Sequence, residues 1–225
     1  MVKPLIRTWI QGCCARGDII AMLAGCQTLR FRQSRDLFTA DMVLYTGGAD
    51  VNPSLYGEAP LTQTVINLAQ DKEDLACFRA ARQGKKFQVG ICRGSQFLNV
   101  MNGGKLWQHV NNHAGVEHLI RDHETNDIFL ASSTHHQMSI PTNKAQILAT
   151  SNESTEKLSF GRHWDLTMGD NNDVEAYWYS AARCLGVQWH PEWGPKECTE
   201  RFFSYIEKYI NEGALPSYGS GARCA

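Results

Sequence analysis

The part of the sequence with the clearest chemical potential is a cysteine flanked by glycines, in Gly90-Ile91-Cys92-Arg93-Gly94. A glycine, any residue, a nucleophile, any residue and a second glycine are typical of an elbow in which a strand turns sharply into a helix. Without a Cβ at either flank, strand and helix can approach closely and expose the central side chain. The start of a helix also favours thiolate over thiol. The competing interpretation is a tight structural turn without chemistry.

A candidate base lies near the end of the chain, in Gly186-Val187-Gln188-Trp189-His190-Pro191-Glu192. Strand-like alternation places Trp189 on one face and His190 on the other. If the chain stays extended, Glu192 shares the face of His190 and can hold the imidazole Nδ1. A nucleophile, a base and a group that orients the base are what covalent acyl transfer requires. A surface His–Glu pair is the competing interpretation.

The elements that must position these residues alternate between strands and helices in the first half of the chain. Apolar runs and helical periodicity predict them at 5–11, 17–24, 27–31, 41–46, 68–82, 86–91 and 94–101. Such alternation is typical of βαβ units, so the predicted fold is α/β, with a mostly parallel central sheet and helices on both faces. Short extended runs between residues 105 and 189 predict appended antiparallel strands. Apolar spacing over 199–210 predicts a closing amphipathic helix.

Composition limits the domain organisation and the class of partner. With 43% hydrophobic residues we expect one domain over 1–212, and the Gly- and Ser-rich residues 213–225 predict a flexible tail. The formal net charge is −1, and no run of like charges suggests a nucleic-acid-binding arm. No apolar stretch is long enough for a membrane span, and Arg7 interrupts any leader-like segment. We therefore expect a cytoplasmic protein that binds neither nucleic acid nor membrane.

Cysteine and histidine spacing does not predict a metal site. The eight cysteines form no C-x-x-C pair, so most are expected to be reduced thiols. Four histidines are spaced four or five residues apart, namely His109, His113, His118 and His123. Asparagines and a glycine interrupt this stretch, so one helix cannot align the four imidazoles. We expect solvated or hydrogen-bonded imidazoles, no metal and no other cofactor.

Taken together, residues 90–96 and 186–193 closely resemble the two signatures of class I glutamine amidotransferase-like proteins, in the same order. Residues 47–58 are similar to the G-G-x-D-V-x-P-x-x-Y-G-E segment of the γ-glutamyl hydrolase branch, which includes γ-glutamyl-γ-aminobutyrate hydrolases. Ser133-Thr134-His135-His136-Gln137 resembles the S-x-H-H-Q segment of that branch. The resemblance implies the flavodoxin-like class I amidotransferase fold.

The same resemblance implies roles for individual residues. It implies a triad of Cys92, His190 and Glu192. It also implies an oxyanion hole made by the backbone N–H groups of Gly48 and Arg93. Gln96, His135 and His136 are the implied substrate contacts. Because few residues precede Gly47, the first helix and second strand are expected to be shorter than is usual in the family.

The expected activity is hydrolysis of the γ-glutamyl amide bond of a small γ-glutamyl compound by a cysteine nucleophile, through a γ-glutamyl thioester. The first alternative is a glutaminase subunit of an amidotransferase, which would pass ammonia to a synthetase partner. The second is a non-catalytic binding or regulatory module. A synthetase partner is expected only under the first alternative, and a homodimer is left open.

Overall fold

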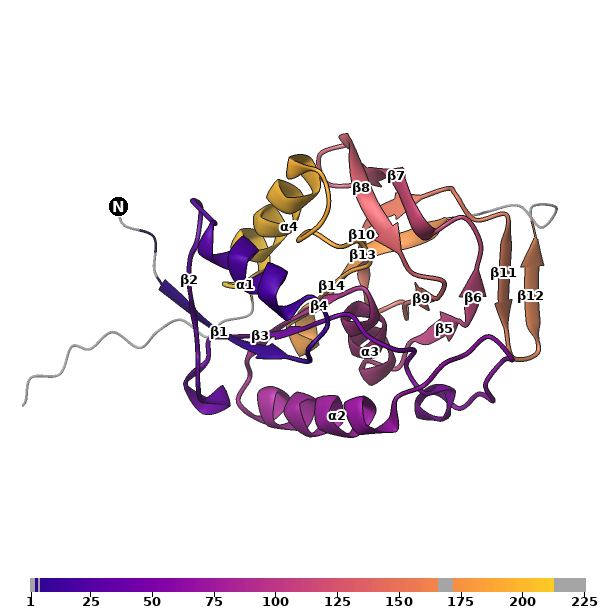
Figure 1. Ribbon diagram of the computed structural model, residues 1–225, viewed down its shortest axis with the longest axis horizontal. Helices are drawn as coiled ribbons and strands as arrows, with labels where there is room; N and C mark the ends of the chain where they lie inside the picture. The colour runs from indigo at the N-terminus through magenta and orange to yellow at the C-terminus, as the bar shows by residue number, and fades with distance from the viewer. Residues whose placement is uncertain (1–2, 4, 166–171, 213–225) are drawn as a thin grey trace, which may run out of the picture.

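The computed structural model describes residues 3, 5–165 and 172–212, in which a nine-stranded sheet lies between helices (Figure 1). The predicted flexible tail, 213–225, lies outside the described residues. In spatial order the strands are β2 (Arg30–Gln33), β1 (Leu5–Gln11), β3 (Met42–Tyr45), β4 (Phe87–Ile91), β14 (Cys184–Val187), β13 (Asp173–Tyr179), β10 (Gln146–Ser151), β7 (Ala114–Asp122) and β8 (Ile128–Thr134).

The sheet changes from parallel to antiparallel at β14. Strands β2, β1, β3, β4 and β14 pair in parallel, and β13, β10, β7 and β8 continue with antiparallel pairing. This confirms the predicted α/β fold with appended antiparallel strands. Strands β3, β4 and β14 are neighbours, so their carboxyl ends meet at one edge of the sheet. Ligands of such folds bind at this edge.

Helices cover both faces of the parallel strands, as predicted (Figure 1). Helices α1 (Arg16–Ala24) and α4 (Lys196–Tyr209) lie on one face, and α2 (Leu68–Gln83) and α3 (Arg93–Met101) lie on the other. Each face has its own apolar layer: Met42 and Leu44 of β3 belong to the first, and Val43 and Tyr45 belong to the second. A strand buried on both faces needs a continuous apolar run, which explains the sequence of β3.

Several boundaries and short strands differ from the sequence-based expectation. Strand β14 ends at Val187, helix α4 begins at Lys196, and the second strand runs over 30–33. The sequence did not predict β9 (Met138–Ile140), β11 (Glu156–Ser159) or β12 (Arg162–Asp165). With β5 (Lys105–Trp107) and β6 (His109–Val110) they form two small sheets, β5-β9 and β12-β11-β6. Strands of two to four residues are too short to show a period.

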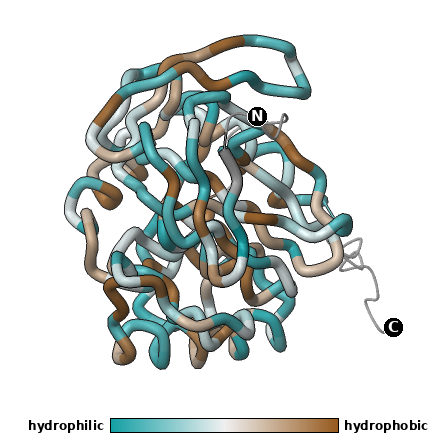
Figure 2. Tube along the Cα trace, turned by 90° about the vertical axis from the view of Figure 1, so that its right-hand side faces the viewer, coloured by the Kyte–Doolittle hydropathy of each residue, from teal (hydrophilic) through white to brown (hydrophobic). Residues whose placement is uncertain are grey.

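Hydropathy is distributed in short segments along the whole chain. Hydrophobic and hydrophilic stretches alternate along the described trace (Figure 2), as expected for elements that each contribute one face to a core. Within the described residues, no helix combines the length and the apolar character needed to cross a membrane.

Candidate active site

The predicted elbow is present between β4 and α3. Cys92 has φ 52° and ψ −113°, a strained conformation for a residue with a Cβ. A Cβ at Gly90 would lie 2.4 Å from the carbonyl oxygen of Gly94, and a Cβ at Gly94 would lie 2.3 Å from the carbonyl oxygen of Tyr45. Both glycines are therefore required by the close approach of strands and helix. The Cys92 N–H donates to the Val187 oxygen over 2.9 Å, which ties the elbow to the strand that precedes His190.

His190 and Glu192 form the predicted contact, but the backbone reaches it differently. The imidazole Nδ1 and a carboxylate oxygen of Glu192 are 2.8 Å apart. The extended path expected between them is wrong, because the N–H groups of Trp193 and Gly194 both donate to the His190 carbonyl oxygen. Pro191 opens this tight turn. The turn folds the Glu192 carboxylate back toward the imidazole. An extended strand would not ensure this contact.

The imidazole of His190 is held on several sides. It is 2% exposed, and the Trp193 ring stacks on it with centroids 4.5 Å apart and an interplanar angle of 18°. Burial disfavours the charged ring, but interactions with Cys92 and Glu192 outweigh burial and raise the pKa of His190 to about 10. At neutral pH the imidazolium is therefore the favoured form, which suits a partner of a thiolate.

The loop after β3 lies against the imidazole. A Cβ at Gly47 would lie 3.2 Å from Cε1 of His190, so the imidazole and this glycine are in close contact. Gly48, at φ 156°, would place a Cβ 2.4 Å from the Gln70 amide oxygen, and the Gln70 amide nitrogen donates to the Gly47 oxygen over 3.3 Å. Gln70 thus fixes the loop that carries one of the two predicted oxyanion donors.

Arg93, the source of the other predicted donor, is anchored by its side chain. The guanidinium is 2% exposed and pairs with Asp71 and Asp74 of α2, while Nε donates to the Ala49 oxygen over 3.1 Å. Burial raises the pKa of both carboxyl groups, although the charge of Arg93 opposes this shift. Breaking a buried ion pair is costly, so this network locks the start of α3 to α2 and to the Gly47–Gly48 loop.

Two residues near the site were missed from the sequence. Cys14, for which the sequence predicted no role in the site, has its sulfur 3.4 Å from the position of a Cβ at Gly47. Burial, followed by the proximity of Cys92 and Glu192, raises the pKa of the Cys14 thiol. Gln70 lies in the first turn of α2 and has no motif around it. Neither residue carried a signal, because only the packing of β1, β3 and α2 brings them to the site.

The three predicted substrate contacts occupy different environments. Gln96 is buried, and its amide nitrogen donates to the Gln137 oxygen over 2.9 Å. His135 is also buried, and its Nδ1 lies 2.9 Å from the same oxygen. His136 is half-buried, and its Nε2 lies 3.0 Å from Asp50, which raises its pKa. Of the three, His136 has the side chain most accessible to a ligand. The substrate roles stay predictions.

Several known proteins resemble this chain in sequence. The peptidase C26 profile matches residues 32–192. The glutamine amidotransferase-like protein YvdE of Lactococcus lactis subsp. lactis is 32% identical over 177 residues, which cover 74% of this chain and 73% of YvdE. Protein NtpR of Enterococcus hirae is 29% identical over 174 residues, 68% of this chain and 66% of NtpR.

Solved structures extend the likeness to the fold. A glutamine amidotransferase from Thermotoga maritima superposes with a TM-score of 0.55 at 15% identity, covering 90% of this chain and 82% of that one. Identity this low shows the shared fold alone. The family profile covers more than half of the chain, and the similarity to YvdE extends over about three quarters of it. The chain therefore belongs to the peptidase C26 family, within the class I glutamine amidotransferase-like superfamily.

Proposed function

We propose that the protein hydrolyses the γ-glutamyl amide bond of a small γ-glutamyl compound through a γ-glutamyl thioester on Cys92. One observation carries the proposal: a cysteine at a strained elbow interacts with His190, whose Nδ1 is 2.8 Å from a carboxylate oxygen of Glu192. This is the relation of nucleophile, base and orienting group that covalent acyl transfer uses.

The mechanism begins with attack of the Cys92 thiolate on the γ-carbonyl carbon. The carbonyl oxygen becomes negative and accepts hydrogen bonds from the backbone N–H groups of Gly48 and Arg93, each worth roughly 3 kcal/mol in comparable sites. His190 then protonates the departing amine, and the γ-glutamyl thioester remains. Water, deprotonated by His190, attacks the thioester carbonyl carbon, which releases glutamate and regenerates the Cys92 thiolate beside the protonated imidazole. Glu192 holds the imidazole in one orientation throughout.

The proposal is tested with the purified chain alone and a panel of γ-glutamyl amides. Glutamine, γ-glutamyl-γ-aminobutyrate and a short polyglutamate are incubated separately, and the released amine is measured for each. We expect turnover of at least one γ-glutamyl amine without an added protein. Turnover of glutamine only, and only when a synthetase is present, would instead support the amidotransferase subunit. No turnover of any member under either condition would contradict both.

Glu192→Gln is expected to lower kcat/KM by roughly 10³- to 10⁴-fold, as for other orienting carboxylates. It should also shift the pH profile. The pKa of His190 is raised to about 10 partly by Glu192, so the wild type should lose activity as pH rises through about 10. The variant loses one of the raising interactions, and its alkaline limb should move to lower pH. The measurement is kcat/KM between pH 6 and 11.

Glu200→Gln is the matched control, because Glu200 is exposed and pairs with Lys196 on α4. This variant should keep both the rate and the pH profile of the wild type.

The stability of the wild type should follow the titration of His190. A folded-state pKa above the ordinary 6.5 stabilises the protein below pH 6.5, and this contribution is lost as pH rises through about 10. An alkaline limb unmoved in Glu192→Gln would contradict the assigned contact.

A further inference from the structure

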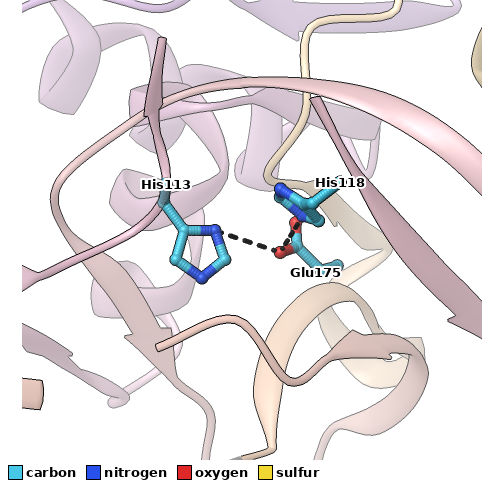
Figure 3. A group of neighbouring side chains, drawn as sticks. All are labelled: His113, His118 and Glu175. Carbon is cyan, nitrogen blue, oxygen red and sulfur yellow. Dashed lines mark hydrogen bonds and ion pairs between the residues drawn. The ribbon is translucent and has the colours of Figure 1, made fainter. Parts of the chain in front are cut away.

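A buried polar cluster lies where two strands of the large sheet separate. Strands β10 and β7 pair only at Ala149 with Asp122 and at Thr150 with Arg121. Beyond these pairs, His118 of β7 faces Glu175 of β13 directly, with 2.9 Å between Nε2 and a carboxylate oxygen. His113, just before β7, approaches the same carboxylate (Figure 3).

Glu175 lies in a stretch of β13 where the pairing with β10 is irregular. Ile147 is opposite Tyr177, Ala149 is opposite Ala176 and Thr150 is opposite Val174, so two register shifts follow each other and cancel. Irregular pairing of this kind is common beside functional sites. The carboxylate of Glu175, 1% exposed, lies beside two imidazoles.

The hydrogen bonds of His113 determine which of its ring nitrogens carries a proton. Its Nε2 is 3.1 Å from a carboxylate oxygen of Asp173. That same oxygen also accepts from the N–H groups of Glu153 and Ser154, and Lys157 pairs with the other oxygen. Asp173 is thus a fixed, ionised acceptor, and Nε2 is the donor. The neutral ring then has a bare lone pair on Nδ1.

This lone pair points at another acceptor. The Nδ1 of His113 is 3.6 Å from the Glu175 oxygen that also accepts from His118 and from Ser151, and 3.6 Å is too long for a hydrogen bond. His113 Nδ1 is buried and has no hydrogen-bond partner among the described residues, and the same holds for the second oxygen of Glu175. Two electron-rich atoms facing each other in the interior need a positive charge between them, which either a proton on Nδ1 or a bound metal ion supplies.

We propose that His113, His118 and Glu175 bind a divalent transition-metal ion of the zinc type. Their three ligand atoms all lie within 4.8 Å of one another, so small side-chain rotations suffice to bring them around one ion. Two imidazoles and one carboxylate are a known zinc ligand set. Asp173 on the far nitrogen of His113 and Ser151 on Glu175 supply the outer hydrogen bonds that orient metal ligands.

The site connects to the proposed active site by direct contacts. The His113 ring stacks on His135, with centroids 4.7 Å apart and an interplanar angle of 29°. His135 and Gln96 both contact the carbonyl oxygen of Gln137, and Gln96 lies one helical turn after Cys92. The ion would therefore hold in place the segment that carries His135 and His136. The proposed role is structural, because all three ligands are buried.

The experiment uses the full chain, stripped of metal with a chelator and titrated with Zn²⁺ against a chromogenic competitor. The Cys92→Ala background removes the nucleophilic thiol as an alternative zinc ligand. We expect one tightly bound Zn²⁺ per chain, a rise in the melting temperature on addition of Zn²⁺, and a fall on chelation. Co²⁺ should give the visible spectrum of a four-coordinate nitrogen and oxygen site, without a sulfur charge-transfer band.

Variants then identify the ligands. Glu175→Gln and His118→Gln should weaken Zn²⁺ binding by roughly 100-fold or more, and Asp173→Asn by about 10- to 100-fold. His163→Gln is the control, because His163 is an exposed histidine paired with Glu156, and it should bind as the background does. If a variant does not fold, the Co²⁺ spectrum of the background protein decides.

Three outcomes would overturn the proposal. The first is a background protein that binds no Zn²⁺ and has the same melting temperature with and without it, in which case the cluster is a hydrogen-bonded network only. The second is Zn²⁺ binding that Glu175→Gln and His118→Gln both retain. The third is a Co²⁺ spectrum with a sulfur band. Each of these results leaves the proposed hydrolase activity untouched, because that activity is measured separately on the amide panel.

Discussion

Cys92→Ala is expected to lower γ-glutamyl amide hydrolysis by at least about 10⁴-fold, because the thioester cannot form without the sulfur. The melting temperature should change little, since the side chain loses one atom at a position that is 7% exposed. Activity is measured by release of the amine. Acid-quenched samples are examined by mass spectrometry, which should find a γ-glutamyl adduct in the wild type and none in the variant.

Cys13→Ala is the matched control for this prediction, because Cys13 is an exposed thiol outside the elbow. It should retain the wild-type rate and the adduct. Under the non-catalytic alternative, neither the wild type nor Cys92→Ala would release amine or form the adduct. If Cys92→Ala kept its hydrolytic rate, or if the adduct mapped to a different cysteine, the assignment of the nucleophile would be wrong.

Gly94→Ala is expected to destabilise the protein by about 3 kcal/mol or more, at the upper end of the cost of overpacking. A Cβ at this position would lie 2.3 Å from the carbonyl oxygen of Tyr45, and neither the strand nor the helix can move away without breaking the elbow. The free energy of unfolding is obtained from denaturant titration followed by circular dichroism. Residual activity should fall as well, because any relief of the clash displaces Cys92.

Gly17→Ala provides a control with the same change at the same helical position. Gly17 is the second residue of α1, as Gly94 is the second residue of α3, and a Cβ at Gly17 would meet nothing within 4 Å. Alanine restricts the unfolded chain, so this variant should be neutral or more stable by up to about 1 kcal/mol. Equal effects at the two glycines would show that close packing at the elbow is not what requires Gly94.

Local sequence determined those features that depend on neighbouring residues. The glycines around Cys92 define the elbow, and the apolar run of β3 defines a strand buried on both faces. Alternation after residue 184 correctly separated Trp189, which packs in the core, from His190. Parallel strands followed by antiparallel strands were also predictable, because element order and spacing restrict the topology.

Tertiary structure decided what depends on atoms distant in the sequence. Two features arise only when strands and helices pack: the contacts of Gln70 and Cys14 with the Gly47–Gly48 loop, and the anchoring of Arg93 by α2. The cluster of His113, His118 and Glu175 is a further case. Its spacing resembles no metal motif, because the separation of two strands brings side chains of distant segments together. Such irregularities depend on pairing between distant segments, and the residues within one segment carry no trace of them.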